Sequence, residues 1–370
     1  MIKCINVISD TNIGGAGKIL LSFLRNYDRA LLDLSVIVPR DSALIPEIEE
    51  TGVRCIQMDG IADRSYDRAD VAKFMEIFQR EKPDVVHCHA TLSGRIAARR
   101  YGCKVVSTRH SVFDQPAWKK IFPFRQMLGW VNNHYSDTII AVSPAAKENI
   151  TEIGTDPSKV TVVFNGVDPA RVLTNEEKQQ VRESYGIGPD EFVCAIIARL
   201  EEVKGHSYIL QAARLLQDKG EKVRIIIAGV GSVEEALKRQ AEALGLRNVI
   251  FAGFVTEIYK IENIMDLQLN ASYGTEATSL ALLEGMSLGV PALVSDFGGN
   301  PYVIEEGVNG LIVPKKDAQA ICDGILRVMR DQELYESMQR QSPQVFQKRF
   351  TSQAMTRGIE QVYRELTGEE

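Results

Sequence analysis

Short apolar runs alternate along the chain with stretches whose apolar residues recur at helical spacing. In the first half the runs predict strands at Lys3–Ser9, Leu34–Val38, Val53–Met58, Val85–His89, Lys104–Arg109, Thr138–Val142 and Val160–Phe164. Helices are expected between them, among them Ser42–Thr51 and Val71–Arg80. Because parallel strands are usually joined by a helix, this strict alternation predicts a parallel sheet covered on both faces.

The sequence Asn165-Gly166-Val167-Asp168-Pro169 interrupts the alternation. Asn-Gly favours a turn and proline fixes the exit, so we expect the inter-domain hinge here. Beyond it strands are expected at Val193–Ile197, Val223–Ala228, Val249–Ala252, Leu267–Ala271, Pro291–Val294 and Leu311–Val313, and helices near Thr174–Tyr185, His206–Lys219, Val233–Leu244, Leu280–Ser287 and Ala318–Met329. The predicted fold class is therefore α/β, with two Rossmann-like doubly wound parallel-sheet domains, residues 1–168 and 169–351, that face each other across a cleft.

The composition is that of a soluble globular protein, since 45% of the 370 residues are apolar and 25% are charged. A formal net charge of −6 argues against a nucleic-acid partner. The six cysteines form no Cys-x-x-Cys pair and fall mostly in apolar runs, which indicates reduced core residues of a cytoplasmic protein. No signal peptide is expected at the N-terminus, and no apolar run approaches the ~18 residues of a membrane span.

One segment of the first half departs from this charge balance. Residues 85–130 carry eight lysines and arginines against Asp114 alone. Within this basic stretch, Phe113–Val131 contains both tryptophans of the chain and three phenylalanines. Aromatic residues among cations are typical of an interfacial helix on an anionic membrane, so peripheral attachment at the inner face of a membrane is one hypothesis. A long helix that packs by its aromatic side chains explains the pattern equally well.

Two glutamates of the second half, Glu276 and Glu284, lie eight positions apart with no charged residue between them. Small residues follow the first, and an apolar helical run from Ser279 leads into the second. A helix N-terminus offers free N–H groups and a partial positive charge, which suit a phosphate, while a carboxylate on each side can accept hydrogen bonds from sugar hydroxyls. An ordinary capped helix with both glutamates in solvent accounts for the spacing equally well.

Gly14-Gly15-Ala16-Gly17 lies between a predicted strand and a helix expected from Lys18. It does not match the dinucleotide fingerprint, because Leu20 occupies the place of the third glycine. It does not match the Walker pattern either, because Ile19 replaces the residue that would bind magnesium. These mismatches disfavour a hydride-transfer enzyme and an ATPase. The segment is either a loop where a ligand approaches backbone amides near Gly15 or only a tight turn.

Several residues at strand ends of the second half could bind a diphosphate and a base. Arg199 ends a predicted strand and Lys204 precedes the next helix, so two cations would stand beside a helix N-terminus. Gly229 and Gly231 form another junction of strand, glycine and helix, and Phe254 could form an apolar wall for a flat base. The alternative is that the two cations are ordinary surface charges and that the glycines only form turns.

Histidines gather on two predicted strands of the first half. His87 and His89 alternate on one strand and so share a face, and His110 closes the next strand. A metal site would need a third ligand, and none lies near them in sequence. The chain also has no Asp-x-Asp pair through which a divalent ion could hold a diphosphate. We therefore expect no metal and no other cofactor, with cations and helix dipoles neutralising the diphosphate instead.

In combination these motifs resemble the retaining family 4 glycosyltransferases of the GT-B fold, and the resemblance covers nearly the whole chain. It rests on Gly14–Gly17, Val86-His87-Cys88-His89, Ser107-Thr108-Arg109-His110, Val142-Ser143, Asn165-Gly166-Val167-Asp168, Arg199-Leu200 with Lys204-Gly205, Gly229-Val230-Gly231, Gly253-Phe254-Val255, and the Glu276 to Glu284 element with Leu288-Gly289-Val290-Pro291. By this resemblance the first domain would bind the acceptor and the second a nucleotide-sugar donor. The last helix, residues 352–366, would pack back on the first domain.

The resemblance also implies roles for the two glutamates and the two cations. Glu284 would bind the ribose hydroxyls of a nucleotide sugar, and Glu276 would bind hydroxyls of the donor sugar. Arg199 and Lys204 would neutralise the diphosphate leaving group. Catalysis would therefore fall to Arg199, Lys204 and Glu276 together with His110, which would lie near the donor sugar.

The remaining donor contacts would come from backbone. Amides near Ser279 and Leu280 would bind the phosphate, and Gly15 would approach the donor diphosphate or the acceptor. One departure from the family is clear, because the family usually has Gly-Phe-Gly after its first glutamate and this chain has Ala277-Thr278-Ser279. The missing glycines would narrow the loop, so we expect the donor preference to be set there.

The implied activity is metal-independent transfer of a hexose-type sugar, with retention, from a nucleotide-diphosphate sugar such as a UDP-sugar. The acceptor would be lipid-linked, a polysaccharide or a small molecule, in surface-glycan biosynthesis. Departure and attack on one face of the sugar would need no carboxylate nucleophile, and the protein would supply positioning and charge stabilisation. The alternatives are a sugar-nucleotide epimerase or phosphorylase on the same fold, and a non-catalytic regulator that binds a sugar nucleotide.

Overall fold

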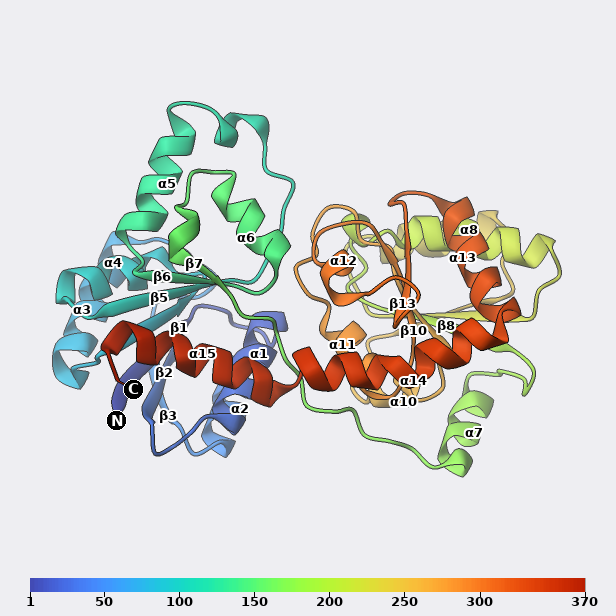
Figure 1. Cartoon of the computed structure of the whole chain (residues 1–370), viewed down its shortest axis with the longest axis horizontal. Coiled ribbons are helices and arrows are strands. Elements are labelled where there is room, and N and C mark those ends of the chain that lie inside the picture. Colours follow the sequence, from blue (N-terminus) through green and yellow to red (C-terminus); the bar gives the residue numbers. More distant parts are fainter. Residues whose placement is uncertain (370) are drawn as a thin grey trace. The chain divides into compact units, whose positions relative to one another are not determined.

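The computed structural model describes residues 1–369, and the chain divides into two compact units (Figure 1). The first unit comprises Met1–Val167 and the segment that begins at Thr351, and the second comprises Asp168–Phe350. Each unit has its own parallel sheet and its own apolar core. The predicted α/β fold class with two doubly wound sheets is confirmed.

Seven parallel strands form the sheet of the first unit, in the order β3-β2-β1-β4-β5-β6-β7. They are β1 (Ile2–Ile8), β2 (Leu32–Pro39), β3 (Arg54–Met58), β4 (Val85–His89), β5 (Lys104–Arg109), β6 (Thr138–Ala141) and β7 (Val160–Val162). The order reverses between β1 and β4, where Asn6 pairs with His87 and Ile8 with His89. Ligands of open α/β sheets bind at the carboxyl ends of the strands beside such a reversal. The strand that carries His87 and His89 therefore lies at the edge where a ligand is expected.

Helices connect and cover these strands. They are α1 (Gly15–Asn26), α2 (Ile45–Glu50), α3 (Arg68–Glu81), α4 (Leu92–Tyr101), α5 (Phe124–His134), α6 (Pro144–Thr151) and α15 (Ser352–Thr367), with short 3₁₀ helices η1 (Ala117–Lys120) and η2 (Pro157–Lys159). Helix α15 packs against α1, where the rings of Phe23 and Tyr363 meet edge to face at 6.2 Å. The end of the chain thereby completes the first unit.

The second unit has six parallel strands in the order β10-β9-β8-β11-β12-β13. The strands are β8 (Phe192–Ile197), β9 (Val223–Ala228), β10 (Val249–Gly253), β11 (Leu267–Asn270), β12 (Ala292–Ser295) and β13 (Gly310–Val313). The helices are α7 (Asn175–Ser184), η3 (Glu202–Lys204), α8 (His206–Asp218), α9 (Glu234–Ala243), α10 (Tyr259–Glu262), α11 (Leu280–Ser287), α12 (Asn300–Val303), α13 (Ala318–Arg330) and α14 (Gln332–Arg349). Here the order reverses between β8 and β11.

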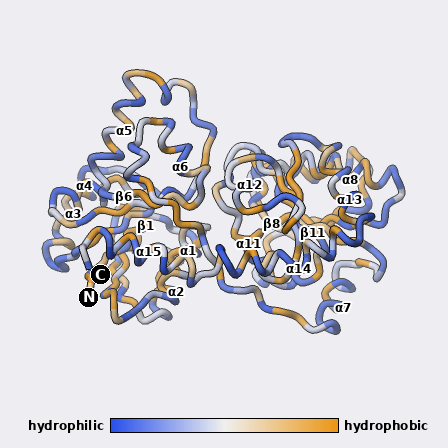
Figure 2. Tube along the Cα trace, viewed as in Figure 1, coloured by the Kyte–Doolittle hydropathy of each residue, from blue (hydrophilic) through white to orange (hydrophobic). Residues whose placement is uncertain are grey.

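Alternate residues of β8 belong to two separate apolar cores. Cys194 and Ile196 share one core with residues of α8 and α13, and Val193 and Ala195 share the other with Ile261. A strand covered on both faces has no polar face, so its sequence is a continuous apolar run. Figure 2 shows these central strands in hydrophobic colours, while the outer segments change colour along their length.

Two helical segments differ from expectation. Helix α1 begins at Gly15, so Gly15 and Gly17 belong to its first turn, and the expected start at Lys18 is wrong. Glycine has a low helix propensity, which made a helical turn look like a loop. Helix α14 was not expected, because it is largely polar and contains Pro343. Only four of its residues are buried, so its apolar periodicity is weak.

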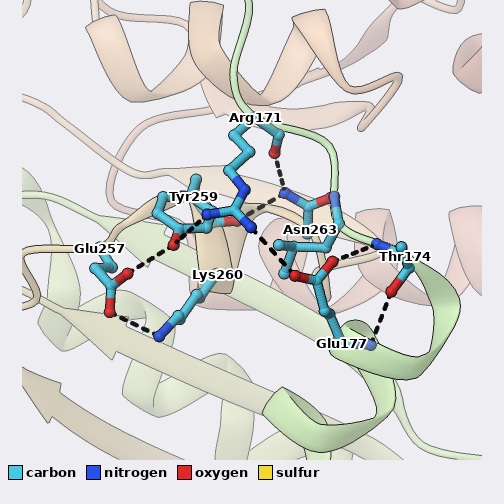
Figure 3. A network of polar contacts seen from close by, with 8 residues as sticks. Arg171, Thr174, Glu177, Glu257, Tyr259, Lys260 and Asn263 are labelled. Atoms are coloured by element: carbon cyan, nitrogen blue, oxygen red, sulfur yellow. Dashed lines mark hydrogen bonds and ion pairs between the residues drawn. The ribbon is translucent and has the colours of Figure 1, made fainter.

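Polar contacts fix the chain where it enters the second unit (Figure 3). Arg171 forms an ion pair with Glu177 at 3.2 Å and lies over the ring of Tyr259 at 5.1 Å. The side chain of Asn263 donates to the carbonyl of Arg171 at 2.7 Å and accepts the N–H of Leu173 at 2.9 Å. The first of the two connections between the units, at Val167–Asp168, therefore lies just before this anchored segment.

Candidate active site

Two loops meet at the strand reversal of the second sheet. Residues 198–204 follow β8, and residues 271–279 follow β11. The backbones of the two loops lie so close that a Cβ on Gly205 would be 2.1 Å from the carbonyl oxygen of Ala271. Gly205 also has a φ of +76°, which favours glycine. The Lys204-Gly205 pair is thus explained in part by the approach of the two loops.

The carboxylate of Glu276 is the centre of hydrogen bonding between these loops. Its Oε2 accepts hydrogen bonds from Lys204 Nζ at 3.0 Å, Asn270 Nδ2 at 3.0 Å and Ser272 Oγ at 3.1 Å. Lys204 Nζ also donates to the carbonyl of Thr275 at 3.0 Å. The side chains of Lys204 and Glu276 are only 15% and 7% exposed, so they form a buried ion pair. Oε1 of Glu276 has no hydrogen-bond partner among residues 1–369 and can accept one from a ligand hydroxyl.

Further buried polar side chains hold the partners of Glu276 in place. Asn300 Nδ2 donates to Asn270 Oδ1 at 3.4 Å and to Ser295 Oγ at 3.1 Å. Ser295 Oγ in turn donates to the carbonyl of Ser272. Asn270, Ser272, Ser295 and Asn300 were not predicted from the sequence as site residues. The sequence does contain a sign of them, because Asn270 ends a buried strand and Asn300 begins a helix. A buried side-chain amide without a hydrogen bond would cost free energy, so both residues should have polar partners.

Two glycines after β12 pack against the backbone of the loop that carries Glu276. A Cβ on Gly298 would lie 2.2 Å from the carbonyl oxygen of Glu276, and one on Gly299 would lie 1.6 Å from that of Ala277. The N–H of Gly299 also donates to the carbonyl of Glu276 at 3.0 Å. The segment Ala277-Thr278-Ser279 is therefore fixed by backbone packing, and no residue with a side chain fits at 298 or 299 without movement.

Helix α11 begins as the sequence predicts, with Ser279 as its N-cap. The Ser279 hydroxyl accepts the N–H of Leu282 at 3.5 Å, and the amides of Leu280 and Ala281 precede the first intrahelical bond. A small pocket lies between the ends of β8 and β11 and this first turn, lined by Ala195, Ile196, Ile197, Ala198, Gln268, Leu269, Asn270, Ser279, Ala281 and Leu282. The pocket and the uncapped amides suit an anionic group.

Glu284 lies one turn into α11 and is half-buried. The next residue, Gly285, allows the helix to pack on the side chain of Gln268, because a Cβ there would lie 2.3 Å from its Nε2. That amide donates to the carbonyls of Leu282 at 3.3 Å and Val290 at 3.2 Å. The helix that carries Glu284 is thus tied to the strand that ends next to Glu276.

Arg199 differs from Lys204 in both exposure and pairing. It is exposed, and no carboxylate in the described part of the chain lies within ion-pair distance of it. Glu201, two residues on, instead accepts the hydroxyl of Ser232. Of the two expected cations, Arg199 therefore forms no ion pair within the described residues, although its charge helps to lower the pKa of Glu201, whereas Lys204 is paired with Glu276.

The remaining donor-site candidates follow β9 and β10. A Cβ on Gly229 would lie 2.1 Å from the carbonyl oxygen of Ala198, and one on Gly231 would lie 2.3 Å from that of Leu200. Both glycines are thus explained by packing against the loop that carries Arg199. Phe254 is 75% exposed, so its ring is accessible to a ligand.

Gly15 and His110 belong to the first unit. Gly14 caps α1 without a side-chain hydrogen bond, and a Cβ on Gly14 or Gly15 would meet no atom within 4 Å. Protein packing therefore does not explain these two glycines, unlike Gly17, where a Cβ would lie 2.9 Å from Leu44.

His110 ends a chain of buried polar side chains. Its Nε2 lies 2.8 Å from His89 Nδ1, and His89 Nε2 lies 3.3 Å from Asn6 Oδ1. Burial lowers the pKa of His110 to about 4. Burial, with the neighbouring imidazoles, lowers the pKa of His87 to about 3 and that of His89 well below its ordinary value. All three imidazoles are therefore neutral at pH 7.

Residues 1–369 contain no group of three or more His, Cys, Asp or Glu side chains arranged to hold a metal ion. No helix in the same range is long and apolar enough to cross a membrane.

Two family models match the chain in succession. The model described as Glycosyltransferase Family 4 matches residues 13–171, and the model described as Glycosyl transferases group 1 matches residues 177–345. The chain belongs to these glycosyltransferases. This family membership confirms the resemblance inferred from the motifs.

Known proteins support the same assignment. The glycosyltransferase is 28% identical over 266 residues to the putative glycosyltransferase EpsD of Bacillus subtilis, with 68% of each chain covered. It is 26% identical over 280 residues, 72% of each chain, to the UDP-Gal:alpha-D-GlcNAc-diphosphoundecaprenol alpha-1,3-galactosyltransferase of Escherichia coli. The solved structure of Anabaena Alr3699/HepE in complex with UDP and glucose superposes with a TM-score of 0.85 at 20% identity, covering 99% of this chain and 100% of that one. This likeness shows the GT-B fold.

Proposed function

We propose that this glycosyltransferase moves a hexose-type sugar from a nucleotide-diphosphate donor to an acceptor hydroxyl with retention of configuration. The observation that carries the proposal is the buried pair of Lys204 and Glu276, which leaves Oε1 of Glu276 open near the first turn of α11. A carboxylate held in this way can accept a hydroxyl of the donor sugar without being free to rotate. Because a solved relative holds UDP and glucose, a UDP-hexose is the donor we propose.

The proposed donor site divides the charge of the diphosphate among protein groups. The amides of Leu280 and Ala281 bind one phosphate, and Arg199 binds the other. Glu284 binds the ribose. In the reaction the bond between the anomeric carbon and the diphosphate oxygen breaks, and the acceptor oxygen bonds to that carbon on the same face. The acceptor proton passes to the leaving diphosphate, so no carboxylate nucleophile and no metal is needed.

The activity is tested by incubating the protein with UDP-glucose, UDP-galactose or UDP-N-acetylglucosamine in EDTA. We expect slow release of UDP without an acceptor, and a free sugar that first appears as the α-anomer in proton NMR. Release of the β-anomer would contradict retention, and activity restored only by a divalent ion would contradict metal independence. Binding of a donor without any release would instead support the non-catalytic regulator.

Changing Arg199 to alanine is expected to weaken UDP binding about 10- to 100-fold. A hydrogen bond to a charged group contributes about 1.5–3 kcal/mol, and Arg199 is exposed and forms no ion pair within 4.0 Å among residues 1–369. Isothermal titration calorimetry measures the change. Arg239→Ala is the matched control, because Arg239 is an exposed arginine of α9 in the same unit. If both substitutions weakened UDP binding equally, the effect would come from the net charge of the protein and not from a contact of Arg199.

We also propose that the acceptor is lipid-linked and is reached at an anionic membrane surface, in the biosynthesis of a surface glycan. Thirteen large apolar side chains are exposed in the described part of the chain, and seven of them lie between Phe113 and Trp130. Phe122 is 78% exposed and Ile121 is 59% exposed. Lys119 and Arg125 belong to the same segment. The Escherichia coli relative is named for a diphosphoundecaprenol substrate, which is consistent with this acceptor class.

Changing both Ile121 and Phe122 to serine is expected to reduce binding to phosphatidylglycerol vesicles at least tenfold. Burying an apolar side chain of this size contributes about 1.5–3 kcal/mol. Vesicle sedimentation measures the bound fraction. Val172→Ser is the control, because Val172 is 71% exposed but lies in the second unit. Unchanged sedimentation of the double variant would contradict a membrane role for this segment.

A further inference from the structure

A polar network starts from Asn6, in the middle of the apolar strand β1. Asn6 is fully buried, and its side chain hydrogen-bonds in two directions. One branch runs through His89 to His110, as described above. In the other direction the amide faces Cys4. A second group of contacts joins Tyr363 of α15 to His87, whose ring stacks on that of His89 with centroids 4.4 Å apart. Burying an asparagine in a strand costs free energy unless both the oxygen and the nitrogen of its amide have polar partners. We therefore ask what the contacts of Asn6 determine.

The contact with Cys4 lies on the side of the amide away from His89. Asn6 Nδ2 points toward Cys4, with the nitrogen 4.0 Å from Sγ. The Tyr363 hydroxyl lies 2.7 Å from His87 Nδ1, and His87 Nε2 lies 2.6 Å from Thr108 Oγ1. The amide nitrogen of Asn6 thus faces Cys4, and its Oδ1 faces His89 Nε2.

This orientation sets the tautomers of the first branch. A neutral imidazole has one N–H donor and one nitrogen acceptor. Because Asn6 Oδ1 can only accept, His89 Nε2 donates to it, and His89 Nδ1 must then accept from His110 Nε2. The proton of His110 is thus on Nε2. Its Nδ1 is an acceptor that has no hydrogen-bond partner among residues 1–369.

We propose that Asn6, acting through His89, is a positioning residue that holds His110 in the Nε2–H tautomer and presents Nδ1 to a sugar hydroxyl. The identity of the sugar rests on the proposed function, but the tautomer does not. A fixed acceptor selects a ligand with a hydroxyl at that point over one without a donor. The hydroxyl belongs either to the donor sugar or to the acceptor. The two possibilities differ in whether donor hydrolysis falls together with transfer to the acceptor.

The tautomer is tested by long-range proton–nitrogen NMR of the whole protein labelled with ¹⁵N-histidine, with His110 assigned from the His110→Asn spectrum. In the wild type we expect a protonated Nε2 and an unprotonated Nδ1 for His110. In Asn6→Leu the anchor is lost, and we expect a mixture of both tautomers. Thr108→Val is the matched control, because it removes a partner from the His87 branch only and is expected to leave His110 unchanged.

The wild-type spectrum alone can overturn the proposal, even if Asn6→Leu does not fold. A proton on Nδ1 of His110 would do so, and so would an Asn6→Leu spectrum like that of the wild type. Where Asn6→Leu folds, transfer from the donor is expected to fall about tenfold in kcat/KM, while UDP affinity stays unchanged. An equal fall in donor hydrolysis assigns the hydroxyl to the donor sugar, and a fall in transfer alone assigns it to the acceptor. A wild-type protein without turnover would contradict the proposed function but not the tautomer.

Discussion

Replacing Lys204 with methionine is expected to destabilise the second unit by about 3–5 kcal/mol and to reduce turnover at least 100-fold. The stability loss arises because Glu276, 7% exposed, would keep a buried charge with only the neutral Asn270 and Ser272 beside it. The turnover loss arises because the carboxylate that is proposed to hold the donor sugar would lose its strongest orienting partner.

A double-mutant cycle measures the pair. Urea unfolding of Lys204→Met, Glu276→Leu and the double variant should show that the double variant loses less stability than the two single losses combined, because the apolar pair leaves no buried charge behind. Lys238→Met is the control, because Lys238 pairs with Glu234 on the exposed surface of a helix, where solvent screens the ion pair. A Lys204 variant as stable as the Lys238 variant would show that the pair is not effectively buried.

The cycle also separates the roles of the two cations. The sequence placed Arg199 and Lys204 together as partners of a diphosphate. The structure pairs Lys204 with Glu276, whereas Arg199 forms no ion pair among residues 1–369. We therefore expect the Arg199 substitution to act mainly on donor affinity, and the Lys204 substitution to act on stability and on the rate of the chemical step.

The elements of the fold were predictable because local patterns determine them. Strands such as Val223–Ala228 are buried on both faces, so their apolar runs are continuous, and Ser279 has the side chain that an N-cap requires. Helix α14 was missed for the converse reason. It buries few residues, and tertiary packing rather than pattern keeps it helical.

The contacts of the candidate site were not predictable, because they join residues far apart in the sequence. Lys204 and Glu276 are 72 positions apart, and only the order of the strands brings their loops together. Gly229 and Gly231 were expected to make room for a ligand, whereas they also make room for the neighbouring loop. A glycine pattern cannot distinguish these two causes, since both require a missing side chain.

The histidine network also joins residues that are far apart in the sequence, so its contacts could not be predicted either. The motif that contains His87 and His89 was visible, and the shared face of the two was expected. The partner that gives the network its direction is Asn6, which is set by the pairing of β1 with β4, and Tyr363 comes from the far end of the chain. A sequence without strand order offers no reason to connect these residues.

Lowering the pH from 6.5 to 4.5 is expected to destabilise the first unit by up to about 4 kcal/mol per pH unit. The folded first unit keeps His87, His89 and His110 neutral, because burial lowers their pKa values to about 3, well below the ordinary value, and to about 4. In the unfolded chain they take up protons below about pH 6.5. The unfolded state then binds up to three more protons than the folded state, and each contributes about 1.4 kcal/mol per pH unit to unfolding.

The sign and the window follow from these values. The histidines contribute no pH dependence well above pH 7, where they are neutral in both states, and their contribution destabilises the folded unit as the pH falls until His110 itself titrates near pH 4. Urea unfolding at several pH values gives the slope, which counts protons and does not depend on the absolute stability of a variant. His87→Gln is expected to reduce the slope by about one proton, or 1.4 kcal/mol per pH unit. A flat stability between pH 6.5 and 4.5 would mean that the three imidazoles do not remain neutral in the folded unit, and would remove the basis for a fixed tautomer at His110.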